Sequence, residues 1–328
     1  MVGAAMRFSI LRCCFLVSLA LTAGNNFAAE PYPVKPLHFI TVLPAGPDAY
    51  IRVLAARFGE QMGQGAVVDN RPGGSGVPAV QAVLGARPDG YSLLIYSVVL
   101  LISKSLQPSL PFDPIADFAP FAKVYGGGAS VLVVRPDSPF RNVQDLIAQA
   151  KATPGKLTHG GPIGLLGHLN AASFLAIAGV KGFHVPFKST GDDMPAILRG
   201  DIDFTFLATT VALPQVVAGK FRALAVTSAD RIRALPEVPT MRELLNHELL
   251  VQDNWTGLAV HAKTPEEIVR RLNAETVKAL LDPGVRKAIE SGGNEPAADE
   301  SPEQFVAFSR RELDKRKEIV KLTGVKLE

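Results

Sequence analysis

Two turns rich in glycine and proline are the segments of this chain best suited to binding a small anion. The first, residues 44–48, follows an apolar run at 37–43, and the second, residues 160–164, precedes a helix that contains His168. The first turn of a helix has N–H groups without backbone partners, and the helix dipole makes that end positive. Such an end holds a carboxylate without help from Arg or Lys. Two of them facing across a cleft would clamp a small organic acid, whereas either turn alone could simply connect two elements.

The motifs of several other kinds of site are missing. The chain has no Gly-x-x-x-x-Gly-Lys-Ser/Thr loop for nucleotides and no Gly-x-Ser-x-Gly elbow, which leaves Ser75 and Ser97 as weak candidates for a nucleophile. The six histidines are scattered without an acid between a pair four apart, so we predict no metal site. His168 falls in the first turn of its helix, where it either contacts a ligand or bonds to its own loop.

The first thirty residues are typical of an export signal. Arg7 and Arg12 precede an apolar stretch at 13–23, and small residues follow as far as Ala29. The stretch is too short to span a membrane. Both cysteines of the chain lie inside this signal, so the mature chain has no disulfide, thiol nucleophile or Cys-ligated metal. We therefore predict a periplasmic protein with a signal at 1–29, and leave the cleavage site open.

Charge and length limit the class of protein further. The signal takes two arginines from the 34 basic residues, so 32 remain against 31 acidic ones. A nearly neutral chain without a basic stripe is not expected to bind nucleic acid. About 300 residues exceed what one hydrophobic core usually organises, which favours two domains.

Strands and helices alternate along most of the chain. This alternation is typical of mostly parallel sheets covered by helices on both faces. The last third is mostly helical, and its capping boxes begin at Thr240, Thr264 and Ser301. The strands that the apolar patterns predict cover residues 37–43, 66–68, 91–96, 131–134, 183–187, 201–207 and 222–227.

The order of these elements predicts two α/β units joined by crossing strands. We expect the strand at 222–227 to return to the first unit. The first domain would then comprise residues 30–124 plus 225–328, and the second domain residues 125–224. The fold class is α/β, with a mostly parallel sheet flanked by helices in each domain.

An ordered set of motifs resembles one protein family from end to end of the mature chain. They include Asn-Arg-Pro-Gly-Gly-Ser-Gly at 70–76, Pro-Asp-Gly-Tyr at 88–91, Leu-Pro-Phe-Asp-Pro at 110–114, Val-Pro-Phe-Lys at 185–188, Arg-Ala-Leu-Ala-Val-Thr-Ser at 222–228 and Trp-Thr-Gly-Leu at 255–258. With them the chain resembles the Bug family, the periplasmic solute-binding receptors of tripartite tricarboxylate transporters.

This resemblance implies a two-domain periplasmic-binding-protein fold of the Venus-flytrap type, with crossing strands as its hinge. It implies a small organic acid or related amide in the interdomain cleft, held by backbone amides, hydroxyls and ordered water. The expected partners are this ligand and the transporter's membrane subunits; we expect a monomer with no enzyme activity, cofactor or metal. The predicted ligand-binding residues are Pro44, Ala45, Gly46, Asp48, Ser97, Gly160, Gly161, Gly164, Leu165, His168 and Thr209.

Departures from the family pattern bear on the ligand. The first turn is two glycines shorter than is usual in the family, and Leu165 and Leu166 stand where the family has hydroxyls. Residues 206–208 read Phe-Leu-Ala where the family often has Phe-Asp-Asn. Unpaired carboxylates are costly to bury among apolar groups. We therefore favour a carboxylate or amide with an aromatic or aliphatic body over a tricarboxylate. The alternative for either leucine is a place in the core, and Trp255 either packs or lines the cleft.

Two other functions stay open at this point. One is an orphan sensor of the same fold, which presents its ligand without a dedicated permease. The other is a secreted hydrolase on a two-domain α/β scaffold, against which the missing nucleophile elbow counts.

Overall fold

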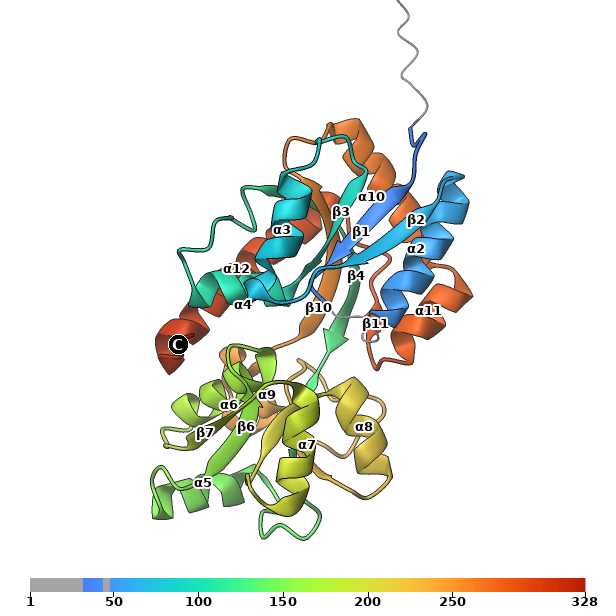
Figure 1. Ribbon diagram of the computed structural model, residues 1–328. Coiled ribbons are helices and arrows are strands. Elements are labelled where there is room, and N and C mark those ends of the chain that lie inside the picture. Colours follow the sequence, from blue (N-terminus) through green and yellow to red (C-terminus); the bar gives the residue numbers. More distant parts are fainter. Residues whose placement is uncertain (1–31, 44–47, 328) are drawn as a thin grey trace, which may run out of the picture. The chain divides into compact units, whose positions relative to one another are not determined.

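The computed structural model describes residues 32–43 and 48–327, and residues Lys35–Glu328 form one compact unit (Figure 1). The predicted signal and the predicted ligand residues Pro44, Ala45 and Gly46 lie outside the described residues. Everything below concerns the described part of the compact unit.

A six-stranded mixed sheet forms the larger of the sheets. Its strand order is β11-β4-β10-β3-β1-β2, in which β1 pairs in parallel with both β2 and β3. Strand β10 is antiparallel to its neighbours β3 and β4. The strands are β1 (Leu37–Thr41), β2 (Ala66–Asn70), β3 (Ser92–Ser97), β4 (Phe118–Gly128), β10 (Asn254–His261) and β11 (Glu295–Pro296).

The helices of this sheet follow the predicted 3.6-residue period. In α2 the side chains of Ile51, Leu54, Phe58 and Met62 are buried on one face, as predicted. The helices are α2 (Ala49–Met62), α3 (Val77–Leu84), α4 (Val98–Leu106), α10 (Glu266–Leu280), α11 (Pro283–Glu290) and α12 (Pro302–Thr323), and a short 3-10 turn, η1 (Gly74–Gly76), precedes α3.

Smaller sheets occupy the middle of the chain. Strand β5 lies between β8 and β9 and is antiparallel to both, while β6 and β7 form a parallel pair that an isolated bridge joins to β8. The strands are β5 (Ser130–Val134), β6 (Thr158–Pro162), β7 (Phe183–Phe187), β8 (Thr205–Ala208) and β9 (Arg222–Val226). The helices are α5 (Val143–Ala152), α6 (Leu166–Ile177), α7 (Thr190–Arg199), α8 (Thr209–Val217), α9 (Met241–Leu245) and the 3-10 turn η2 (Glu248–Leu250).

The strand at 222–227 does not return to the larger sheet, so this expectation was wrong. Strand β9 pairs with β5, and Met241 and Leu250 further along still pack in the same core as β5. The chain rejoins the larger sheet only at β10. An apolar strand fits a buried position in either sheet, so its composition does not select its partner. The division of domains at residues 124 and 224 stays a prediction.

Trp255 belongs to the core of the larger sheet. Its side chain is fully buried, and its ring centroid lies 5.9 Å from that of Tyr96 and 5.8 Å from that of Phe305. The indole Nε1–H donates to Glu312 Oε2 over 3.1 Å, and Arg316 Nη2 lies 2.7 Å from the same oxygen. Of the two alternatives for Trp255, packing in the core or lining the cleft, the structure shows packing in the core. Among the described helices, none combines the length and apolarity needed to cross a membrane.

Candidate ligand-binding site

Helices α2, α4, α6 and α8 each follow a strand and begin without a side-chain cap. The N-cap residues of α2, α4, α6 and α8 are Asp48, Ser97, Leu165 and Ala208, and none of these side chains caps the backbone of its helix. They follow β1, β3, β6 and β8. Ligands of α/β proteins usually bind beyond the carboxyl ends of the strands, where such helix starts lie. These starts are therefore the places where backbone N–H groups are available to an anion.

The carboxylate of Asp48 is buried and binds neighbouring side chains of the protein. The side chain is buried, and its Oδ2 lies 2.8 Å from Arg52 Nη2 and accepts from Asn70 Nδ2 over 2.9 Å. Asn70 also donates to the carbonyl of Leu43 over 2.9 Å. This arrangement ties the start of α2 to the end of β2.

Hydroxyl groups gather at the end of β3, beside the start of α2. Buried Ser97 is the cross-strand partner of Thr256, which is in turn opposite Tyr125 on β4. Tyr50 Oη donates to Thr256 Oγ1 over 3.5 Å, and its ring packs edge-to-face on that of Tyr125 with centroids 5.3 Å apart. Burial raises the pKa of both tyrosines, which stay neutral donors. Sequence reasoning found Ser97 and missed Tyr50, although Tyr50 follows the first turn by two residues.

The glycines of the second anion turn have different roles. A Cβ at Gly160 would lie 2.5 Å from Ile202 Cδ1 and 3.0 Å from Phe187 Cε2, so this position is glycine because the core packs against it. Gly161 has φ of +144°, and its Cβ would lie 3.3 Å from the backbone N of His168. Gly164 has φ of +72°. Both backbone conformations favour glycine, and the turn they form brings the chain close to the start of α6.

The two leucines at the start of α6 differ in environment. Leu165 is the N-cap residue, has an extended backbone and is 40% exposed. Leu166 is partly buried and packs against the core of the larger sheet. The alternative of a core position therefore holds for Leu166, while Leu165 presents apolar surface beside the open N–H groups of the helix.

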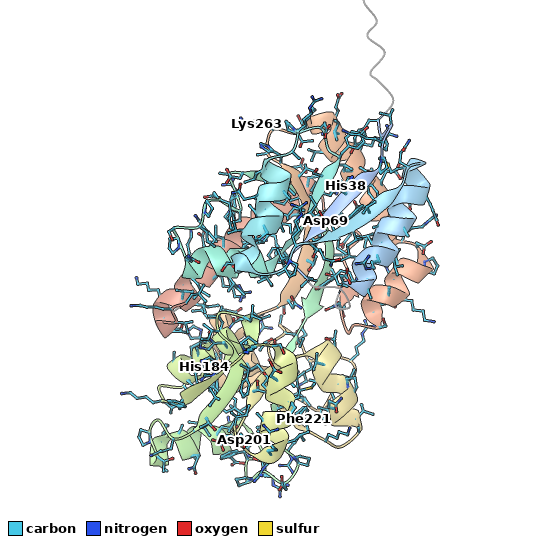
Figure 2. All side chains as sticks on the ribbon, in the orientation of Figure 1. His38, Asp69, His184, Asp201, Phe221 and Lys263 are labelled. Carbon is cyan, nitrogen blue, oxygen red and sulfur yellow. The ribbon has the colours of Figure 1, made fainter. Side chains whose placement is uncertain are left out.

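His168 bonds to its own loop, which is one of the two alternatives the sequence left open. Its Nδ1 accepts the N–H of Gly164 over 3.2 Å. The ring is buried and stacks on His184 of β7, with centroids 3.7 Å apart and planes 4° apart; Figure 2 labels His184. Burial, followed by the proximity of His184, lowers the pKa of His168 to about 4. Among the described residues, no group of His, Cys, Asp or Glu is arranged to hold a metal ion.

Thr209 is the first residue of α8, and its hydroxyl is directed back to the sheet. Its Oγ1 donates to the carbonyl of Ala129 over 2.8 Å, and its N–H donates to the same oxygen over 3.0 Å. Thr209 also lines a cavity of about 680 Å³ between residues of α8, α11 and the segment 228–234. The glycines of the second turn do not line this cavity.

Comparisons with known proteins concern the family and the fold. The model of the tripartite tricarboxylate transporter family receptor matches residues 50–325. The protein BugT of Bordetella pertussis is 32% identical over 305 residues, which cover 92% of this chain and 93% of BugT.

Two similar solved structures contain small carboxylates. A protein of R. palustris with adipate has a TM-score of 0.77, is 27% identical, and is matched over 90% of this chain and 99% of its own. MatC of Rhodopseudomonas palustris with bound malate has a TM-score of 0.75, is 25% identical, and is matched over 88% of this chain and all of its own.

The predicted fold, that of a two-domain α/β periplasmic binding protein, is confirmed by these structures. The family named from the sequence motifs is also confirmed, because the match spans most of the chain. This chain belongs to the solute-binding receptor family of the tripartite tricarboxylate transporters.

Proposed function

We propose that this receptor captures a small carboxylate with an aliphatic or aromatic body, and that it binds the carboxylate at the uncapped starts of α2 and α6. The observation that carries the proposal is the start of α6. Leu165 occupies the N-cap position, where Ser, Thr, Asp or Asn usually accepts the first-turn N–H groups, and its apolar side chain is exposed. The same residue thus leaves N–H donors for an anion and offers apolar surface beside them.

The donors of this site are neutral. Its contributors are backbone N–H groups at the second turn and the hydroxyl cluster of Ser97, Thr256 and Tyr50. Arg52, near the start of α2, is paired with Asp48 and donates to Asn70. Neutral donors suit one carboxylate at each end of a ligand better than a cluster of three on one short molecule.

The ligands of the similar structures support a carboxylate. Malate and adipate each have two carboxylates, and adipate separates them by an unbranched aliphatic chain. An aliphatic body of this kind would bury its surface against Leu165, which stabilises binding by about 25 cal/mol for each Å² removed from water, before ordering costs.

Export and domain closure complete the proposal. The N-terminal signal would direct the protein to the periplasm, where it would pass its ligand to the transporter's membrane subunits. In place of the predicted boundaries at residues 124 and 224, we propose a hinge where β4 ends at Gly128 and β5 begins at Ser130, with the second crossing at β10. Closure around this hinge should reduce the radius of gyration in solution scattering when ligand saturates a monomeric protein. N-terminal sequencing of exported protein should find a start between Asn25 and Pro31.

Calorimetric titration with adipate, hexanoate, benzoate, malate and citrate tests the ligand class. We expect an acid with an apolar body to bind most tightly, and citrate as the tightest ligand would overturn the proposal. Leu165→Ser should weaken hexanoate binding and leave thermal stability unchanged or higher. Leu166→Ser is the matched control, because its side chain packs in the core and its loss should lower the melting temperature.

A further inference from the structure

Two stacked imidazole rings hold the second anion turn at both of its ends. His184 on β7 makes a hydrogen bond of 2.9 Å from its Nε2 to the carbonyl of Gly161. His168 on α6 accepts the N–H of Gly164 at its Nδ1 over 3.2 Å. The rings are nearly parallel at a centroid distance of 3.7 Å. The turn between Gly161 and Gly164 is therefore bracketed by one pair of side chains from two different elements.

Both hydrogen bonds require a defined protonation state. A carbonyl only accepts, so His184 Nε2 carries a proton and donates. A backbone N–H only donates, so His168 Nδ1 must be without a proton and the neutral ring carries it on Nε2. A second proton on His168 would place N–H against N–H and break the bond to Gly164. It would also place a positive charge against the stacked ring of His184.

The surroundings of the pair offer little to stabilise a positive charge. His159 of β6 lies 6.1 Å from His168 and 5.1 Å from His184 between ring centroids, and it is a third imidazole rather than an acid. Asp193 of α7 lies beside Gly160, because a Cβ added at Gly160 would be 3.3 Å from the Cβ of Asp193. The carboxylate of Asp193 accepts a hydrogen bond from Thr205.

Among the described residues, no ion pair joins either ring to the other elements that pack on α6. Strand β8 has no charged residue, and Glu248 on η2 pairs with Arg242 at 3.5 Å. Helix α12 contacts this region through apolar groups, among them Ile319, which belongs to the same hydrophobic cluster as Leu166 of α6. Burial lowers the pKa of all three histidines, for His159 to about 3, and their mutual proximity lowers it further for His159 and His168.

We propose that His168 and His184 are positioning residues that keep the turn at 161–164 in its ligand-binding conformation, and that this holds only while His168 is neutral, so that acidification releases the turn and weakens ligand binding. The effect on affinity rests on the proposed function, whereas the effect on the turn does not. Neither ring needs to touch the ligand. The assignment of His168 as a direct ligand contact is thereby replaced by a role through Gly164.

The test uses substitutions that keep the hydrogen bonds and abolish titration. Asn at 168 can place Oδ1 where Nδ1 accepts, and Gln at 184 can place its amide N–H where Nε2 donates. Adipate affinity of the wild type should fall at least fivefold more between pH 7 and pH 4.5 than that of the variant His168→Asn/His184→Gln. The ligand's own protonation is common to both proteins and cancels in this ratio. His159→Phe is the matched control and should keep the wild-type pH dependence, because the bonds that hold Gly161 and Gly164 come from His184 and His168 and not from His159.

A second measurement does not depend on any ligand. In 15N-labelled wild-type protein, a nitrogen–nitrogen coupling should connect Gly164 N and His168 Nδ1, and the Gly164 amide shift should titrate together with the His168 ring. Equal pH profiles for wild type and double variant, or a Gly164 amide that ignores the titration of His168, would overturn the proposal. If adipate and the other acids fail to bind at any pH, the proposed function fails, and the amide titration still decides the role of the pair.

Discussion

Helices α5 and α6 begin in contrasting ways, although both cover the same smaller sheets. At α5 the side chain of Asn142 accepts the N–H of Asp145 over 3.0 Å, and Asp145 accepts the N–H of Asn142 over 3.2 Å. At α6 the equivalent N-cap position is Leu165, which has the extended backbone of an N-cap but no oxygen to accept. A missing cap costs a helix about 1 kcal/mol. The start of α5 is therefore built for stability, whereas the first-turn N–H groups of α6 are left for another partner.

The largest effect on binding should come from the turn before α6. Gly161→Val forces a β-branched residue into φ of +144° and places a Cβ within 3.3 Å of the His168 backbone. We expect adipate affinity to fall at least about a hundredfold, because the turn that directs the N–H groups has to move; a calorimetric titration measures this.

Gly155→Ala is the matched control at the far end of α5. It has φ of +78° with nothing within 4 Å of the added Cβ, so it tests backbone strain alone. It should lower the free energy of unfolding by about 1 kcal/mol and leave affinity unchanged. Unaltered affinity in Gly161→Val would remove the second turn from the site.

Exchanging the two kinds of helix start should give the next largest effect. Leu165→Asp supplies the missing cap to α6, so it should raise the free energy of unfolding by up to about 1 kcal/mol. Its charge lies where the carboxylate is proposed to bind, and adipate affinity should fall more than tenfold. Asn142→Ala should do the reverse, with about 1 kcal/mol of stability lost and affinity retained. A Leu165→Asp protein that binds adipate like the wild type would show that the start of α6 is not the anion site.

The sequence predicted the elements around this contrast better than their partners. The apolar face of α2 and the strands β1, β2, β3, β5, β7, β8 and β9 were predicted from apolar patterns, because burial imposes such patterns, whereas β4 and β6 were not predicted. The sheet to which β9 belongs could not be predicted in this way, because strand pairing depends on residues that are distant in the chain. The capping box at Asn142 and the leucine at 165 are both local, and both are visible in the sequence once the helix starts are known.

The candidate site was predictable where it depends on backbone and less so where it depends on side chains. Gly161, Gly164 and Leu165 are at the start of α6, as expected from the turn. Gly160 was assigned to the ligand, but the core fills the space beside it. His184 was missed because it is distant in sequence from the turn that it holds, and only the parallel pairing of β6 with β7 brings the two together.

Asp193 lies on the side of Gly160 that faces the core, and its titration tests whether that side is buried. Burial raises the pKa of this carboxyl to about 6, so the folded protein holds a proton that the unfolded chain has already released above pH 4. Stability from this group is complete below pH 4 and is lost as the pH rises through 6. Asp193→Asn should therefore gain about 2 kcal/mol relative to wild type between pH 4 and pH 8 in denaturant titrations. A constant difference across that range would contradict the buried proton.

The smallest effect is expected at α8. A substitution at its start tests whether a missing cap is sufficient for ligand binding. Like α6, this helix has no capping side chain, and its N-cap is Ala208. Unlike α6, its first hydroxyl is engaged, because Thr209 Oγ1 donates to the carbonyl of Ala129. Thr209→Val removes that bond, but the carbonyl still accepts the N–H of residue 209, so no buried acceptor is left unpaired. The loss of stability should be about 0.5–1 kcal/mol, with adipate affinity within twofold of the wild type. A larger drop in affinity would return Thr209 to the ligand site predicted from the sequence, and it would make α8 a further binding start in addition to α2 and α6.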